Sequence, residues 1–223
     1  MKMLSLLVAC ALLSTSAARA EQPLKNKVAR ATEVLDSLLG GKDRPPPQLL
    51  SATSCVLVVP RIIKGAFGFG GRRGKGVVSC RNDDSWSALA FVKITAVSFG
   101  FQLGGQSTDL VLLVINDRSM RSLLKSKFTI GVDASVTAGP RSAEVQASTD
   151  IRLDAEIYSY SSSKGLFAGA ALDGARVTLL RGQIAEYYDA YVRPEDILFG
   201  SVAVDLPAEA RRFREALQTG FHQ

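Results

Sequence analysis

The sequence is poor in the side chains that most enzymes use. It has a single histidine, His222, which is the penultimate of 223 residues, and chain ends usually fray. A Ser-His-Asp triad and a histidine-based zinc site are therefore not expected. Carboxylates such as Asp133 lack the spacing of a calcium loop. We expect a binding protein without metal or cofactor. An enzyme that depends on Asp109 or Asp133 is the lesser alternative.

The chain also lacks a long apolar run after its first twenty residues, so the rest is not expected to cross a membrane. Those first residues, MKMLSLLVACALLSTSAARA, have the pattern of a signal peptide: Lys2, an apolar stretch Leu4–Leu13, and a small-residue cleavage site that ends at Ala20. In a competing interpretation, Leu7 to Cys10 is a lipobox and the protein is a lipoprotein anchored through Cys10. Both predict export, to the periplasm or the medium.

The sequence has few cysteines and a small net charge. With Cys10 in the leader, Cys55 and Cys80 remain, and an even pair in an oxidising compartment forms a possible disulfide, with two buried thiols as the alternative. The net charge is +6, and loss of Lys2 and Arg19 leaves 25 cations and 21 anions, a net charge of +4. This is too mild to predict a nucleic-acid partner.

Positive charge is concentrated in one segment. Between Arg61 and Arg81 there are six cations, six glycines and no carboxylate. Glycine lets a backbone adopt positive φ and present bare N–H groups, so the segment predicts an exposed basic loop for an anionic, partly apolar surface. The candidate binding residues are Lys64, Phe67, Phe69, Arg72, Arg73 and Lys75. The alternative is a β-hairpin whose arginines form a solvated tip.

Two nucleotide-binding motifs fail in this segment. A P-loop that ends at Gly74-Lys75 would need glycine at 69 and serine or threonine at 76, where the chain has Phe69 and Gly76. A dinucleotide fingerprint from Gly68 would need glycine at 73, where Arg73 stands.

The remaining pattern predicts an α+β fold. Residues 21–46 form an amphipathic helix, Leu24–Leu39, and a proline-rich connection, ahead of one domain over 47–223. That domain has strand-like runs, a short helix near 117–126 and a C-terminal helix, Pro207–Thr219. Because few helices separate the strands, a largely antiparallel sheet is expected. The strand-like runs are Cys55–Val59, Ala88–Gln102, Leu110–Ile115, Phe128–Ala138, Ala143–Asp150, Leu153–Tyr160 and Leu166–Leu180.

Four strings then occur in order: FGFGGRRGKGV from Phe67, FQLGGQSTDLVLLVIND from Phe101, SKFTIGVDASVTAGP from Ser126 and SYSSSKGLFAGAALDG from Ser159. Together they closely resemble the SYLF domain family, over roughly Leu49 to Gly200, and the leader resembles that of exported, bacterial-type members. The resemblance implies binding to phosphoinositide-rich membranes and, in some eukaryotic members, to actin filaments.

By position, the resemblance assigns membrane contact to Leu24–Leu39 and to the basic glycine-rich segment. In a bacterial envelope the anion would be another anionic phospholipid. We therefore expect an exported module that associates reversibly with anionic headgroups. The alternative is an envelope structural protein that binds a protein partner and has no lipid specificity.

Overall fold

The computed structural model describes residues 23–67, 69–83, 85–99, 106–116, 121–122, 128–142, 153–162, 172–200 and 204–221. Side chains at 64–67, 69–70, 97–99 and 106 lie outside this description. The expected leader, with Cys10, is also outside it. Of the short helix expected near 117–126, residues 121–122 are described, and they are helical.

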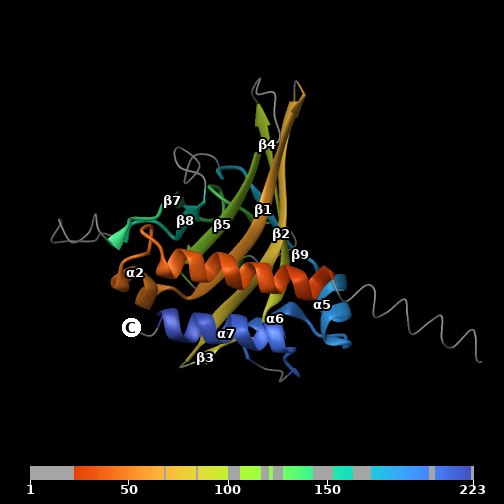
Figure 1. Cartoon of the computed structure of the whole chain (residues 1–223). Coiled ribbons are helices and arrows are strands. Elements are labelled where there is room, and N and C mark those ends of the chain that lie inside the picture. The colour runs from red at the N-terminus through yellow and green to blue at the C-terminus, as the bar shows by residue number, and fades with distance from the viewer. Residues whose placement is uncertain are drawn as a thin grey trace, which may run out of the picture.

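A curled sheet of nine strands dominates the described chain (Figure 1). Its order is β6-β9-β4-β2-β1-β5-β8-β7, with β3 paired to β2, and every pairing except the parallel β7–β8 is antiparallel. The expected α+β class is confirmed. The strands are β1 (Cys55–Phe67), β2 (Phe69–Asn82), β3 (Ser85–Trp86), β4 (Ala90–Phe99), β5 (Gln106–Val114), β6 (Phe128–Thr129), β7 (Val136–Ala138), β8 (Ile157–Ser161) and β9 (Arg176–Leu179).

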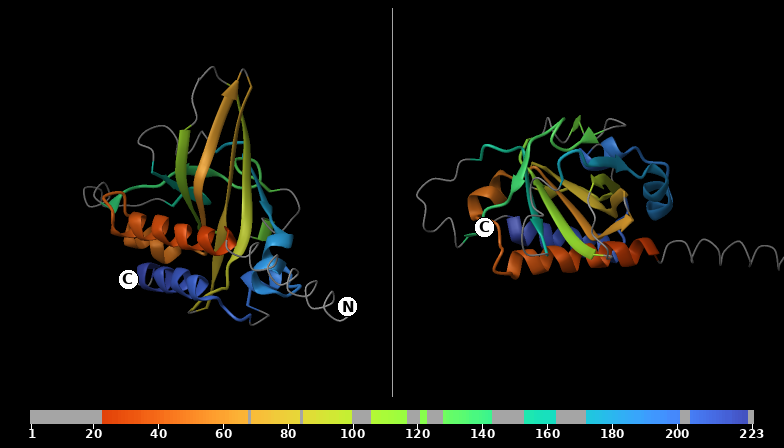
Figure 2. Two further views of the ribbon diagram at one scale, coloured as in Figure 1. Left: turned by 45° about the vertical axis from the view of Figure 1, so that its right-hand side comes forward. Right: turned by 90° about the horizontal axis from the view of Figure 1, so that it is seen from above.

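Helices cover one side of this sheet. Residues 23–40 form the N-terminal helix, and α7 (Ala208–Phe221) runs beside it, as both views in Figure 2 show. Shorter helices complete the set: α2 (Pro47–Ala52), α5 (Arg181–Tyr188) and α6 (Pro194–Leu198). Of the described helices, none is long and apolar enough to cross a bilayer.

The lower halves of the central strands are buried on both sides, because apolar residues occupy both sets of alternating positions. We call the side toward the helices the helix face. On it, Val77 of β2 lies beside Val58 and Phe91, and Phe91 packs edge-on against Tyr187 of α5 at 5.1 Å between ring centroids. The opposite, inner face carries Val78 and Ala90, which are fully buried.

A β-bulge interrupts β1 where it leaves this doubly buried region. The register with both neighbours shifts between Val58 and Ile63, and Arg61 adopts a left-handed conformation with φ 56°. The Arg61 N–H donates to Oδ1 of Asp109 on β5 at 2.9 Å. The side chain of Asp109 thus holds a backbone conformation that non-glycine residues rarely adopt.

Two glycines of β2 make room for the bulge on the inner face. A Cβ at Gly76 would overlap the carbonyl oxygen of Val58 and lie 2.7 Å from Cα of Val59. A Cβ at Gly74 would lie 2.8 Å from Cγ1 of Ile62. The glycines of this segment therefore have a packing role here, in addition to any conformational freedom.

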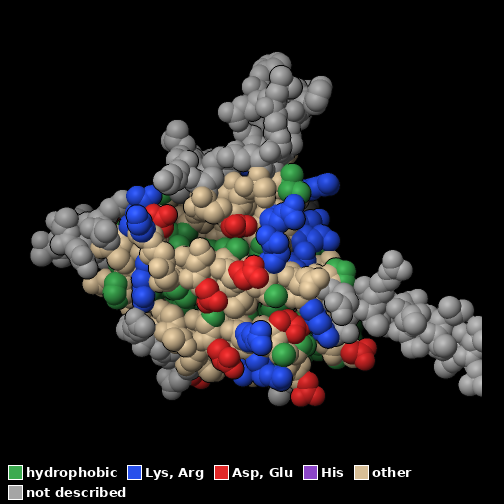
Figure 3. Space-filling model, in the orientation of Figure 1, with side chains coloured by type: hydrophobic (Ala, Val, Ile, Leu, Met, Phe, Trp, Pro, Cys, Tyr) green, Lys and Arg blue, Asp and Glu red, His purple; other side chains and the backbone are tan. Residues whose placement is uncertain are grey.

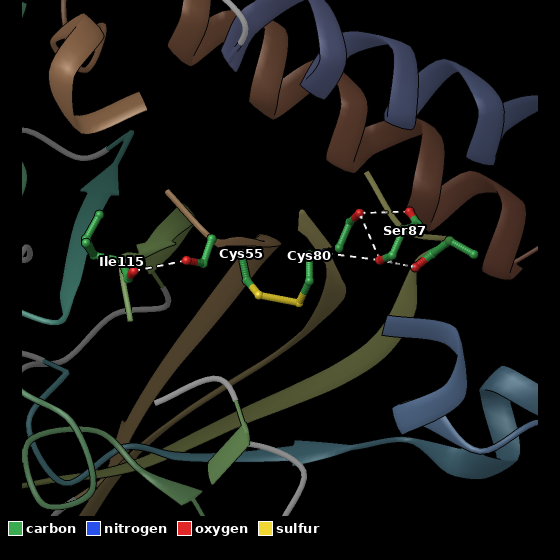
Figure 4. The surroundings of a disulfide bond; sticks show 7 residues. Cys55, Cys80, Ser87 and Ile115 are labelled. Carbon is green, nitrogen blue, oxygen red and sulfur yellow. Dashed lines mark hydrogen bonds between the residues drawn. A yellow bond between two sulfur atoms is a disulfide. The ribbon is translucent and has the colours of Figure 1, made fainter. Parts of the chain in front are cut away.

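A disulfide joins the same two strands below the bulge. Cys55 and Cys80 are directly opposite in the register, with Cα atoms 4.0 Å apart, and both are buried. Figure 4 shows the bridge pointing away from the helices, whereas Ser87 lies toward them and accepts hydrogen bonds that include one from N of Cys80. The possible disulfide is therefore present.

One expected strand is divided. We expected a single strand over Phe128–Ala138, but β6 and β7 are separated by a turn at residues 131–133. Gly131 has φ 85°, and Oδ2 of Asp133 accepts a hydrogen bond from the Thr129 N–H at 2.7 Å. The alternation of apolar residues predicted a continuous strand. A turn forms instead, because the Asp133 side chain accepts the hydrogen bond of the Thr129 N–H.

The contact at Gly76 predicts that Gly76→Ala destabilises the fold by about 3 kcal/mol or more, because the added methyl meets backbone atoms that cannot rotate away. Chemical denaturation of the purified variant measures this loss. Gly182→Ala on α5 is the matched control, since nothing lies within 4 Å of its Cβ. The control should be neutral or stabilising by up to about 1 kcal/mol. Equal stabilities for the two variants would contradict the packing role.

Candidate functional site

The glycine-rich basic segment forms the paired strands of a hairpin, which corrects our first expectation of a loop and agrees with the alternative that we gave for this segment. Lys64 pairs with Arg72 and Phe67 with Phe69 in the register of the β1–β2 hairpin. The side chains of Lys64, Phe67 and Phe69 lie outside the described residues. Their assignment to the site therefore remains a prediction.

Strand geometry separates the two arginines that we expected to act together. Successive side chains of a strand point to opposite faces, so Arg73 shares the helix face with Lys75, while Arg72 shares the inner face with Gly74. Arg72 is half-buried, and burial lowers the pKa of its guanidinium. Arg73 and Lys75 are exposed.

Neighbouring strands add cations to the helix face. Lys93 of β4 lies directly opposite Lys75, and Thr95 lies between Arg73 on β2 and Arg176 on β9 in the register. Arg176 is exposed and Lys93 is half-buried.

The N-terminal helix contributes a fifth cation. Burial, and secondarily the positive charge of Lys75, lower the pKa of the Lys27 ammonium. Lys27 is half-buried on this helix. Figure 3 shows Lys and Arg side chains gathered above the N-terminal end of the helix. We call this surface the basic face; it consists of Lys27, Arg73, Lys75, Lys93 and Arg176.

No ion pair joins a described carboxylate to the basic face. Ion pairs of the described residues, such as Arg141 with Asp43, Arg181 with Glu195 and Arg193 with Asp196, lie elsewhere in the chain. An exposed aliphatic side chain, Ile63, is 48% exposed and lies opposite Arg73 in the register. The surface therefore combines positive charge with one apolar group.

Arg81, the last cation of the segment, has a structural position. Its guanidinium donates to the carbonyls of Leu50 and Ser51 at the end of α2, at 3.2 and 3.1 Å, and to that of Phe221 at the end of α7, at 3.3 Å. It also lies 5.2 Å from the centroid of the Trp86 ring. Carbonyls at helix ends lack partners within the helix, so Arg81 caps two helices at once.

The carboxylates considered for catalysis are engaged with the backbone. Asp109 holds the bulge through N of Arg61, and its own N–H donates to Oγ of Ser162 at 3.0 Å. Asp133 closes the turn after β6. In the described part of the chain, no group of three or more potential metal ligands is found. The residues present favour binding over acid–base chemistry.

Comparison with known proteins now identifies the family. A family model, Ysc84, described as a Las17-binding protein actin regulator, matches residues 95–220. The chain belongs to the Ysc84 family. The resemblance to the SYLF family seen in the sequence motifs is confirmed, since this is the same domain. The model match begins within β4, so the β1–β2 hairpin precedes it.

Individual Ysc84 relatives are similar over most of the chain. SH3 domain-containing YSC84-like protein 1 of Bos taurus is 30% identical over 203 residues, which is 88% of this chain and 59% of the relative. Protein YSC84 of Saccharomyces cerevisiae is 31% identical over 196 residues, 83% of this chain and 42% of the relative. The chain thus spans about half of the curated relatives that it matches. No solved structure matches.

Sequence reasoning missed three members of the basic face. Lys27, Lys93 and Arg176 lie far from the glycine-rich segment along the chain of this Ysc84 member. One signal was available for Lys93, which is the single charged residue of the apolar run Ala88–Gln102. A lone lysine in such a run indicates a position where the strand leaves the core.

The capping contacts predict a separation of roles between two arginines of β2. Arg81→Met should lower the free energy of unfolding by about 2 kcal/mol, because carbonyls at two helix ends lose a charged donor. Arg73→Met, an exposed position, should change it by less than about 0.5 kcal/mol. Thermal and urea denaturation of both variants measure the difference. A destabilisation by Arg73→Met as large as that by Arg81→Met would contradict the assignment.

Proposed function

We propose that this Ysc84 member is an exported module that associates reversibly with anionic phospholipid membranes through its basic face. The observation that carries the proposal is the convergence of five cations from the N-terminal helix, β2, β4 and β9, with no described carboxylate partner. Because these cations form no ion pairs within the described chain, their charge is available to an external anion. Lipid headgroups offer many negative charges in a plane, so several cations of one surface can be neutralised at once.

The expected strength is moderate. A lysine or arginine near an anionic membrane contributes about 1 kcal/mol, so five contribute on the order of 5 kcal/mol before losses to salt screening. Ile63 adds apolar area beside Arg73, and Phe67 and Phe69 at the hairpin tip remain predicted apolar contacts. Such attachment is reversible, because it lacks the large apolar area of an inserted helix.

The disulfide supports the proposed location. A bridge between Cys55 and Cys80 is favoured in an oxidising compartment, and thiols in the cytosol are kept reduced. Export also makes a cytoplasmic phosphoinositide or actin filament unreachable. An envelope phospholipid is then the anion available to the basic face.

A protein partner is the second candidate. The description of the family model names Las17 binding and actin regulation, so a protein-binding surface is also compatible with membership of the Ysc84 family. In an exported chain this partner would be an envelope protein. This candidate predicts no preference between anionic and zwitterionic lipid.

Charge reversal tests the basic face. The double variant Arg73→Glu, Lys75→Glu should lose roughly 100- to 1,000-fold in binding to phosphatidylglycerol vesicles at low salt, because two attractions of about 1 kcal/mol become repulsions of similar size. Cosedimentation across salt concentrations measures this. The matched control is Arg212→Glu, Arg214→Glu, which changes two exposed arginines of α7 by the same total charge. Equal loss in both variants, or wild-type binding to phosphatidylcholine of the same strength, would reject the proposal.

Export predicts a defined mature N-terminus. Intact-mass spectrometry of the protein recovered from cells that secrete it should show a chain that begins at Glu21. A mass that fits a lipid-modified N-terminus at Cys10 would support the lipoprotein interpretation instead. A full-length chain retained in the cytoplasm, with reduced Cys55 and Cys80, would contradict export.

A further inference from the structure

The disulfide lies on the inner face of the sheet, within the core. Figure 4 shows the bridge pointing away from the N-terminal helix and α7. In the register, the row of residues that begins with Cys80 and Cys55 continues to Val114 of β5 and Ile157 of β8. All four side chains are at most 4% exposed. The two sulfur atoms are therefore covered by the rest of the folded sheet.

The sheet covers this inner face by curling on itself. The two ends of its pairing order, β6 and β7, both come from residues 128–138, and an isolated bridge joins Ile130 to Ala134 between them. Val78 and Ala90, on the same inner face, are fully buried. A reagent in the solvent can therefore reach the sulfur atoms only when strands that are distant in the chain are not yet paired, or have separated.

Thiol–disulfide exchange requires direct access to sulfur. A new disulfide forms when a thiolate attacks a sulfur of an existing disulfide, and the reaction passes through a mixed disulfide between the two molecules. A donor of disulfides must therefore touch Cys55 or Cys80, and their burial prevents this in the closed sheet.

The β1–β2 hairpin by itself leaves both cysteines accessible. Its two strands are consecutive in the chain, and their pairing alone brings Cys55 directly opposite Cys80. The pairings that close the sheet join segments much further apart, such as β5 with β8 and β4 with β9. Local pairings form faster than distant ones, because they close shorter loops. The hairpin is thus the stage at which the bridge can form.

We propose that the chain is a substrate of a disulfide-donating partner, which oxidises Cys55 and Cys80 in the β1–β2 hairpin before the sheet closes. The donor is either a thiol–disulfide oxidoreductase or a small disulfide such as oxidised glutathione. This inference rests on the export in the proposed function, because export supplies an oxidising compartment.

The exchange has two balanced steps. One cysteine thiolate attacks the donor's disulfide, which breaks; one donor sulfur bonds to the cysteine, and the other leaves as a thiol. The second cysteine thiolate then attacks the mixed disulfide and releases the remaining donor sulfur as a thiol. Two electrons pass from the cysteine pair to the donor, and the two thiol protons end on the donor's sulfurs.

Early closure of the bridge also prepares the docking of the helices. Arg81 directly follows Cys80, and its N–H donates to the carbonyl of Ser54 at 2.7 Å beside the bridge. The Arg81 guanidinium caps α2 and α7. A hairpin that is already cross-linked at its base therefore presents the donor that both helix ends require.

The time at which the donor is added tests this order of events. The full chain with Cys10→Ser, which keeps Cys55 and Cys80 as its only cysteines, is reduced in urea and refolded by dilution. The donor is added either at dilution or after refolding is complete. Oxidised glutathione is used in one arm, and a purified oxidoreductase with a C-x-x-C site in the other. Alkylation followed by intact-mass spectrometry counts the remaining thiols.

We expect the bridge to form roughly 100-fold more slowly when the donor is added after refolding, because the sheet must then open first. The control is Ser37→Cys in a chain with Cys10→Ser, Cys55→Ser and Cys80→Ser, since Ser37 is an exposed residue of the N-terminal helix. Its thiol should form a mixed disulfide with glutathione equally fast on both schedules. A rapid reaction at dilution with the oxidoreductase alone identifies an enzyme as the donor, and one with both identifies a small disulfide as sufficient.

The other outcomes are also decisive. A reduced chain that stays unfolded by circular dichroism until the donor is added supports the proposal, because the bridge then precedes folding. A refolded chain in which the bridge forms less than about tenfold more slowly than at dilution overturns it, since the closed sheet would not protect the thiols. No bridge on either schedule also overturns it.

Failure of this inference is distinguishable from failure of export. A chain recovered outside the cytoplasm with its leader removed and with free thiols at Cys55 and Cys80 would leave export standing and reject the donor. A chain retained in the cytoplasm whose purified form still shows the difference between the two schedules would reject export and leave the order of oxidation and folding standing.

Discussion

The pairing of β1 with β2 across the bulge is the constraint on which the rest of the structure depends. These two strands lie at the centre of the sheet and are buried on both faces at their lower ends. At the bulge, Asp109 holds the backbone of Arg61, and Gly74 and Gly76 let β1 approach β2 closely. A one-residue change in this register would move every later side chain of a strand to the opposite face.

The distribution of charge follows from that register. Above the bulge, alternate residues of β2 face either the inner side, where Arg72 is half-buried, or the helix face, where Arg73 and Lys75 are exposed. Lys93 and Arg176 join them because β4 and β9 continue the sheet in register. A run of cations that is contiguous in the sequence is thus divided, and cations far apart in the sequence are brought together.

The helices link the doubly buried base of the sheet to this charged upper part. Leu24, Val28, Ala31, Leu35 and Leu39 of the N-terminal helix are buried, and the same helix carries the half-buried Lys27. At the other end of the layer, Arg81 joins α2 and α7 through their terminal carbonyls and lies over the Trp86 ring. Two cations of one sequence segment therefore differ completely in role: Arg73 faces solvent, and Arg81 caps helices.

The sequence by itself determined the α+β class, the N-terminal helix, the Ysc84 membership and the position of most central strands. Those features are local, because they depend on the period of apolar residues and on ordered motifs. Tertiary structure decided between the loop and the hairpin for the basic glycine segment, and it alone decided that Arg72 and Arg73 face opposite sides and that Lys93 and Arg176 join the basic face. Composition cannot reveal these features, because which side a residue faces depends on strand register and on bulges, and register is set by partners distant in the chain.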